Sequence, residues 1–174
     1  MNIIWHGHSC FEITGKDGTI VFDPYQANSV PGLNSLKLKA NLVLCSHEHD
    51  DHNARNCVEV APKDFKVTCI ETYHDHHQGS HRGKNTIHIV DFEDLKVVHM
   101  GDIGCMMDDI SKLKNCDVLM IPIGGYYTID TKEALKYIER IQPRIVIPMH
   151  YCSHEFGYDV LSTNEGFIQK SSNI

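Results

Sequence analysis

Residues 46–52 of the chain read SHEHDDH and follow directly on the apolar run NLVLC. Three histidines and three acidic residues within seven positions offer imidazole nitrogens and carboxylate oxygens, which are the ligands that Zn²⁺ and similar divalent ions take in proteins. His47 and His49 can point into one site from an extended or turning backbone, and Asp51 and His52 can turn to an adjacent one. The spacing H-x-H-x-D-H therefore predicts a metal-binding segment, against the alternative of a polar surface loop.

Other histidines and acids stand directly after further apolar runs. FKVTCIET leads to His74, LKVVHM leads to Asp102 and RIVIPM leads to His150. Because ligands in α/β proteins lie beyond the carboxyl ends of strands, we expect these side chains to meet segment 46–52 at one rim. His74 comes straight after its strand and is the preferred ligand, with His76 as the next choice.

The composition is that of an ordinary globular protein with one oddity, its thirteen histidines. A length of 174 residues is that of one domain and is enough to bury a real core. The formal net charge of −7 argues against a protein that mainly binds nucleic acid or an anionic membrane.

Seven scattered cysteines form no C-x-x-C pair, which favours reduced thiols over a disulfide framework. The start MNIIWHGHSC lacks the features of a signal peptide, and no apolar run has the length of a membrane span. We expect a cytoplasmic protein that does not act at a membrane.

Short apolar runs alternate with a few helical patterns. Strands are expected at 10–14, 19–23, 41–45, 65–72, 86–90, 95–100, 117–125 and 144–151, the first two as a hairpin around the turn GKDG. The strongest helix is 130–141, where Asp130 and Glu133 can form a capping box. A weaker helix is expected near 106–114 and a short one after His52. This interleaving indicates an α/β domain with mixed sheets.

The order of these motifs resembles the metallo-β-lactamase fold superfamily: H-x-H-x-D-H after a strand, a lone His, a Gly-Asp, then a final His. More narrowly, GHSCFEI, VFDP, GGYYTID and IPMHY resemble small metal-dependent hydrolases related to the ascorbate-phosphate lactonases. The resemblance implies an αββα sandwich, with two mixed sheets face to face, helices outside and metals at one edge. It implies a single domain over residues 1–174 that is short at its C-terminus.

The resemblance also implies two adjacent metal sites. The first ion is held by His47, His49 and His74, the second by Asp51, His52 and His150, and Asp102 bridges the two. A hydroxide between the ions is the implied nucleophile, and Asp51 orients it or receives its proton. The ions are divalent, with Zn²⁺ preferred and Mn, Ni or Fe as alternatives. His49 stands where a Glu would indicate a di-iron, oxygen-reducing branch, and this favours hydrolysis.

Four further residues have implied supporting roles. Asp23, in VFDP, resembles an acid that steadies the ligand histidines. His8, in GHS, either packs in the core or contacts ligands or substrate. Arg82 and Lys84 either form a solvated turn or a basic lip that meets an anionic substrate.

These observations predict a metal-dependent hydrolase that acts on an ester, lactone, amide or phosphodiester bond of a small, anionic metabolite. The first alternative is a nuclease or phosphodiesterase of the same fold, and the second is a non-catalytic metal-binding protein. The expected partner is a small-molecule substrate, without nucleic acid or membrane. The sequence leaves self-association into a homo-oligomer open.

Overall fold

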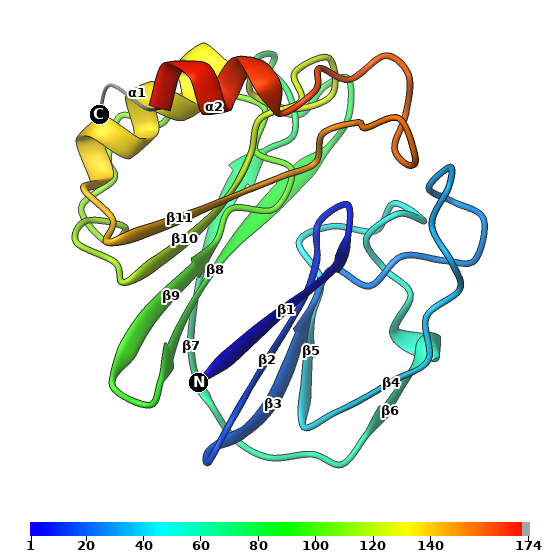
Figure 1. The fold of residues 1–174 in the computed structure, drawn as a ribbon. Helices are drawn as coiled ribbons and strands as arrows, with labels where there is room; N and C mark the ends of the chain where they lie inside the picture. Colours follow the sequence, from blue (N-terminus) through cyan, green and yellow to red (C-terminus); the bar gives the residue numbers. More distant parts are fainter. Residues whose placement is uncertain (172–174) are drawn as a thin grey trace.

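Two β-sheets lie face to face in the computed structural model, which describes residues 1–171 (Figure 1). The first sheet has the order β1-β2-β3-β5, formed by Asn2–Gly7, Cys10–Gly15, Gly18–Phe22 and Leu42–Leu44. β1, β2 and β3 pair antiparallel, and β5 pairs parallel to β3. The carboxyl ends of β1, β3 and β5 therefore point the same way.

The second sheet has five strands in the order β11-β10-β9-β8-β7. Their bounds are Lys66–Tyr73 for β7, Lys84–Phe92 for β8, Leu95–His99 for β9, Val118–Pro122 for β10 and Ile145–Met149 for β11. β7, β8 and β9 pair antiparallel, whereas β9, β10 and β11 pair parallel. In this sheet β7, β9, β10 and β11 share one direction.

Apolar side chains from both sheets fill the space between them. The fully buried members include Phe11, Ile13, Ile20 and Phe22 from the first sheet and Val90, Phe92, Val97 and Met120 from the second. Burying each such side chain contributes about 1.5–3 kcal/mol. This apolar layer holds the two sheets against each other, so that the ends of their strands lie close together.

Two helices cover the outer face of the five-stranded sheet, α1 at Thr131–Ile141 and α2 at Glu165–Ser171 (Figure 1). The predicted capping box of α1 is confirmed: Asp130 Oδ1 accepts from the Glu133 amide, and Glu133 Oε2 accepts from the Asp130 amide. Ala134, Ile138 and Ile141 pack on the sheet as the apolar pattern predicts. The sequence predicts this helix well because its capping residues and the spacing of its apolar residues indicate the same segment.

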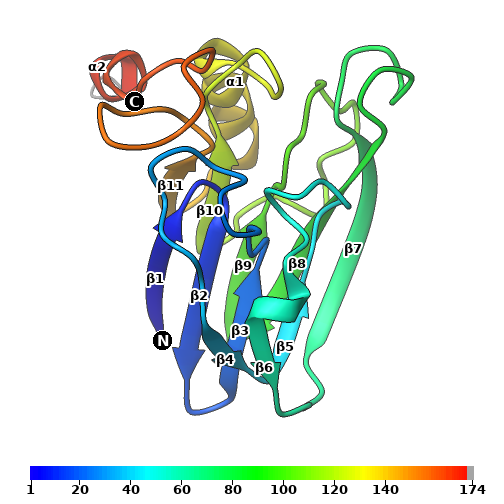
Figure 2. The same cartoon turned by 90° about the vertical axis from the view of Figure 1, so that its right-hand side faces the viewer.

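The expected sandwich of two mixed sheets is confirmed, but its other outer face carries no α-helix among the described residues (Figure 2). A loop at 24–37 and two short parallel strands, β4 (Leu38–Ala40) and β6 (Val58–Val60), pack there instead. The helix expected after His52 is only a 3₁₀ turn, η1, at Arg55–Cys57. The helices of this chain therefore lie on one side of the sandwich.

The predicted strands are confirmed within a few residues. β5 and most of β11 are half-buried. The helix expected near 106–114 is wrong, because the chain forms bends and turns there. Among residues 1–171, no helix has both the length and the apolar character that crossing a bilayer requires.

Candidate metal centre

The histidines and acids singled out in the sequence follow strands that end at one rim. His47 lies beyond β5, and His74, Asp102 and His150 lie beyond β7, β9 and β11. His8 directly follows β1 in the same way. Because these strands share their directions within each sheet, the two sheets bring the five side chains together at the rim.

The backbone turns sharply where the chain leaves the strands. His8, Asp23 and His150 have φ of 52°, 42° and 52°, in the left-handed region that non-glycine residues seldom adopt and that concentrates at functional sites. Gly101 has φ of 56°, and a Cβ there would lie 2.3 Å from Asn85 Oδ1. At the rim, residues in energetically unfavourable backbone conformations therefore direct the side chains toward one another.

Asp102 lies at the centre of the cluster. Its Oδ2 is 2.9 Å from His150 Nε2, 3.1 Å from His52 Nε2 and 3.4 Å from His74 Nε2. Ligand atoms about 2.1 Å from one ion and about 90–110° apart lie about 3.0–3.4 Å from one another. The backbone amide of Asp102 donates to Asn85 Oδ1 at 2.8 Å, which fixes the backbone that carries the carboxylate. The spacing around Asp102 is thus that of a coordination shell.

The remaining ligand atoms fall into two neighbouring groups around this carboxylate. Atoms within 4.8 Å of one another come, in one group, from His47, His49 and His74, and in the other from His8, Asp51, His52 and His150; His47, His52 and Asp102 form a third set that joins them. All seven predicted ligands are therefore brought together, and His8 joins them.

Several polar atoms of the cluster are buried without a hydrogen-bond partner in the described chain. They include His47 Nε2 and Asp102 Oδ1. Buried polar atoms are almost always satisfied in native proteins, so these two need a partner that the protein does not supply. Imidazole nitrogen and carboxylate oxygen suit a borderline divalent ion, and the residues fit a metal centre.

Asp23 orients His47 and His52 from the side of their Nδ1 atoms. Its Oδ2 is 2.8 Å from His52 Nδ1 and accepts from Ser46 Oγ at 2.6 Å; Ser46 Oγ lies 2.9 Å from His47 Nδ1. Burial acts to raise the pKa of Asp23, but His99 and His52 outweigh it and hold the pKa well below its usual range. The Nδ1 hydrogen bonds leave Nε2 of both histidines free for an ion, the arrangement typical of metal-ligating histidine.

His74 shows the same pattern and is the ligand candidate in its loop. Its Nδ1 donates to Tyr127 O at 3.1 Å, and its Nε2 faces Asp102. His76 is exposed and its Nε2 lies 3.7 Å from Glu133 Oε1 instead. The structure therefore places His74, and not His76, in the cluster.

Burial and neighbouring charges shift the pKa values of two histidines in opposite directions. Burial lowers the pKa of His47 to about 3, so its ring is neutral and offers a lone pair. Burial also acts to lower the pKa of His52, but Asp102 and Asp23 outweigh it and raise the pKa well above its usual value. The two carboxylates thus favour positive charge at this point, whether a proton or a metal ion carries it.

His8 is fully buried, and its Nε2 lies 3.2 Å from Asp51 Oδ2. Burial lowers the pKa of His8 to about 4, so the ring is neutral and has one N–H to donate. Its Nδ1 has no partner among the described residues. Because Nε2 of this neutral ring faces Asp51 Oδ2, we interpret His8 as the hydrogen-bond donor to Asp51.

A cavity of about 280 Å³ opens onto the cluster. It is lined by His49, Asp51, His74, Arg82, Asp102, Tyr127, His150 and Tyr158. Sequence reasoning missed Tyr158, whose hydroxyl donates to Ser29 O at 2.7 Å and lies 3.3 Å from Asp51 Oδ2. Lys84 does not line this cavity, and its ammonium lies 3.2 Å from Glu71 Oε2.

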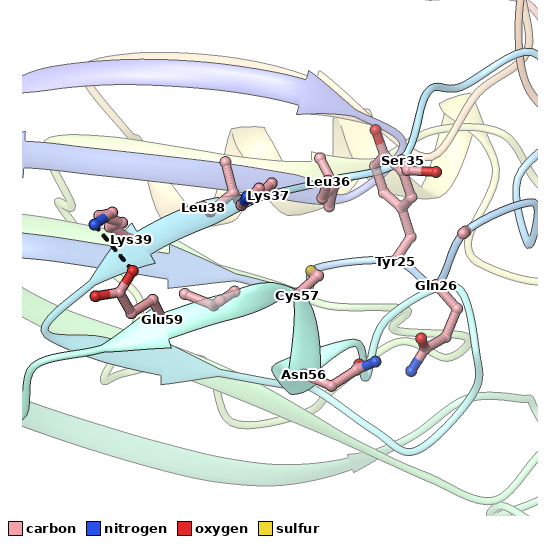
Figure 3. A pocket seen from close by; sticks show the side chains of 12 residues that line it. Tyr25, Gln26, Ser35, Leu36, Lys37, Leu38, Lys39, Asn56, Cys57 and Glu59 are labelled. Carbon is pink, nitrogen blue, oxygen red and sulfur yellow. Dashed lines mark ion pairs between the residues drawn. The ribbon is translucent and has the colours of Figure 1, made fainter.

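A larger cavity of about 700 Å³ lies away from the metal centre, between β4, β6 and residues 25–27 (Figure 3). Its wall carries the exposed ion pair between Lys39 and Glu59, at 2.9 Å. Its lining includes none of the clustered histidines or aspartates. The chemistry therefore belongs to the smaller cavity.

Comparisons with known proteins identify the family and the fold. The family model described as "Beta-lactamase superfamily domain" matches residues 2–150. A UPF0173 metal-dependent hydrolase of Thermoplasma acidophilum is 30% identical in an alignment that covers 87% of this chain and 83% of the relative.

Two solved structures have a similar fold. A candidate Zn-dependent hydrolase of the metallo-beta-lactamase superfamily from Thermotoga maritima aligns with a TM-score of 0.74 and 26% identity, over 97% of this chain and 84% of that one. The metallo hydrolase Igni18 of Ignicoccus hospitalis aligns with a TM-score of 0.70 and 20% identity, over 98% and 90% of the two chains.

Proposed function

The chain belongs to the beta-lactamase superfamily as a metal-dependent hydrolase, and from this premise we propose that it uses two divalent ions to hydrolyse a small, anionic metabolite. The bond cleaved is an ester, lactone, amide or phosphodiester. The proposal places the first ion with His47, His49 and His74, the second with Asp51, His52 and His150, and Asp102 between them.

One observation carries the proposal, the convergence of three Nε2 atoms on Asp102 Oδ2 within 2.9–3.4 Å. A carboxylate has about four lone-pair sites on its two oxygens, so three nitrogens gathered on one oxygen exceed what hydrogen bonding alone would use. Nitrogen atoms at this spacing, with others buried and unpartnered beside them, support a shared ligand between two ions.

When bound, the ions supply an activated water as nucleophile and polarise the oxygen of the scissile bond. The chain's own residues then position the reactants. Asp51 borders the cavity with its Oδ2 beside His8 and Tyr158. Burial acts to raise the pKa of Asp51, but His8 and His52 outweigh it and hold the pKa below its usual range. Asp51 is thus a hydrogen-bond acceptor that can orient an attacking water.

The ligand set is rich in imidazole, which suits zinc, iron or nickel, and its carboxylates also accept manganese. Zinc is our preferred ion because His and Asp ligands at this spacing fit its short bonds. The small cavity of about 280 Å³ and the arginine at its wall support a small, anionic substrate, the class expected from the resemblance to sugar-phosphate lactonases.

The direct test is hydrolysis by purified protein loaded with Zn²⁺ or Mn²⁺, screened against para-nitrophenyl esters, aliphatic lactones, para-nitroanilides as amides, and phosphodiesters. We expect turnover of at least one class, its loss after treatment with a chelator, and its return on adding metal. Asp64→Asn, which changes an exposed acid with no hydrogen bond or ion pair in the described chain, is the control and should keep the activity. A protein that holds two ions and hydrolyses no class would refute the proposal.

A further inference from the structure

We propose that Arg82 recognises a negatively charged group of the substrate, away from the bond that is cleaved, and that Asp75 positions it. The inference rests on the proposed function, because the recognised anion belongs to a molecule that reacts at the metal centre. The chemical class is an oxyanion, carboxylate or phosphate, joined to the reacting group by a short spacer.

Arg82 borders two adjoining cavities at the metal centre. One of about 280 Å³ contains His74 and Asp102, and another of about 440 Å³ contains His47; both are lined by His49 and Arg82. The arginine therefore faces the space that a molecule must occupy to reach the cluster. A group bound by Arg82 would leave the rest of the molecule beside the ligands.

Two tyrosines hold the side chain in a defined place. The guanidinium carbon lies 5.4 Å from the ring centroid of Tyr127 and 5.9 Å from that of Tyr126. Contacts of this kind stabilise an arginine over an aromatic ring while its N–H groups stay free. Because Tyr127 O also accepts from His74, the same residue ties Arg82 to a metal ligand.

The guanidinium of Arg82 has no carboxylate or carbonyl partner among residues 1–171. The three other arginines are all engaged: Arg55 with Glu48 at 2.7 Å, Arg144 with Asp117 at 2.8 Å, and Arg140 with the carbonyls of residues 107 and 108. The chain has a net charge of −7, so acids to pair with are not scarce. An unpaired, half-buried guanidinium beside a metal cluster is suited to bind an anion from solution.

Asp75 fixes the loop that carries the arginine. Its Oδ1 accepts from the amides of His77 and Gly79 at 2.7 and 3.0 Å, and its Oδ2 accepts from those of His81 and Arg82 at 3.0 and 2.8 Å. Four backbone N–H groups thus converge on one carboxylate, which is itself buried. The loop is wrapped around Asp75, and this holds the backbone of Arg82 next to the metal ligand at position 74.

The two halves of the loop are also joined directly. His74 N donates to Gly83 O at 3.1 Å, and Gly83 N donates to Gly79 O at 2.9 Å. These hydrogen bonds close the segment between β7 and β8 into a compact unit. The backbone of Arg82 is therefore fixed by hydrogen bonds in the same loop as His74. A turn that served only to connect two strands would not need this many hydrogen bonds.

The experiment compares two esters on the metal-loaded protein, para-nitrophenyl hexanoate and the mono-para-nitrophenyl ester of adipic acid. They share the ester bond and chain length and differ by one terminal carboxylate. We expect a higher kcat/KM for the adipate ester. Arg82→Gln should lower that preference about tenfold to a hundredfold, mainly through KM, because a charge-assisted hydrogen bond is lost. The rate on the hexanoate ester should stay the same.

Two variants separate charge from position. Lys84→Gln removes the other cation that lines the cavity of about 440 Å³; because its ammonium already lies 3.2 Å from Glu71 Oε2, the change should alter the preference less than twofold. Asp75→Asn keeps one acceptor oxygen and loses the other, so it should lower the preference while Arg82 is still present. Asp75→Asn should also keep the metal content of the wild type, since it leaves every ligand in place.

Calorimetric binding of adipate and hexanoate to the same proteins gives a readout that needs no turnover. If neither ester is hydrolysed, tighter binding of adipate that disappears in Arg82→Gln supports the anion site, and the proposed ester hydrolysis alone fails. Equal preference for the charged ligand in wild type and Arg82→Gln, with normal circular dichroism and metal content, overturns the inference. The inference is also overturned if Lys84→Gln loses the preference for the charged ligand and Arg82→Gln keeps it.

Discussion

Replacing Asp23 by asparagine should weaken the metal centre without removing any ligand. Asp23 is fully buried and accepts three hydrogen bonds, from Ser46 N and Ser46 Oγ at 2.6 Å and from His52 Nδ1 at 2.8 Å. The amide of asparagine has nearly the same shape but one acceptor oxygen instead of two. Its NH₂ group would face a donor wherever it is placed.

The expected loss follows from the contacts on Asp23 Oδ2. That oxygen bonds His52 directly and His47 through Ser46, so both histidines lose their fixed orientation. A hydrogen bond to a charged group contributes about 1.5–3 kcal/mol, and breaking a buried charged pair costs about 3–5 kcal/mol. Changes to such supporting groups reduce metal affinity about tenfold to a hundredfold.

Two measurements check these values in the Asp23→Asn protein. Urea unfolding of the metal-free protein should show a free energy of unfolding lower by about 3–5 kcal/mol. Competition with a chelator should show the fall in Zn²⁺ affinity, with two sites still present. Asp64→Asn, at an exposed position, should change neither. Unchanged metal affinity in a folded Asp23→Asn protein would refute the role of Asp23 as the support of His47 and His52.

Three other substitutions test separate parts of the account. His8→Ala removes the donor to Asp51 Oδ2 and should lower kcat about tenfold to a hundredfold while both metal equivalents stay bound; loss of a whole equivalent by mass spectrometry would show that His8 is a ligand instead. Gly101→Ala places a Cβ 2.3 Å from Asn85 Oδ1 at a positive φ and should lower the free energy of unfolding by about 2–5 kcal/mol in urea; a stable variant would contradict the close packing at this turn. Asp130→Ala removes the cap of α1 and should cost about 1 kcal/mol in the same assay, with no change in metal content; a stability equal to wild type would show that the capping box is dispensable.

The strands could be predicted because their apolar runs are continuous and end at clear turns. Both β2 and β3, around GKDG, appear where the hairpin pattern indicates. By contrast, β4 and β6 are three residues each and read LKA and VEV. Their parallel pairing joins segments far apart in the chain, so local sequence carries no signal for it.

The helix expected near 106–114 fails because tertiary contacts satisfy its backbone in another way. Tyr137 Oη accepts from the Met107 amide and donates to Cys105 O, and Arg140 donates to the carbonyls of Met107 and Asp108. Side chains of α1 thus take up the polar groups that an isolated helix would pair internally. Apolar spacing in this segment reflects anchoring of the loop on the core, and not a helical face.

The clustered histidines and aspartates, and Asp23 beside them, could be predicted from the sequence, whereas the other supporting residues could not. H-x-H-x-D-H is dense enough to stand out, whereas Asn85, which fixes the backbone of Asp102, looks like an ordinary polar residue in a turn. Ser46 could have been noticed, because it lies between the strand and the first ligand. Nothing in the local sequence marks Tyr158, which reaches the cavity from a loop beyond the last strand.

If Asp102 is shared by two metal ions, its removal should change the number of ions that the protein binds. Mass spectrometry should find about two equivalents of metal in protein loaded with Zn²⁺ or Mn²⁺ and desalted. Asp102→Ala, folded by circular dichroism, should lose at least one equivalent. Two equivalents in Asp102→Ala, or less than about half an equivalent in the wild type under every loading condition, would contradict the account.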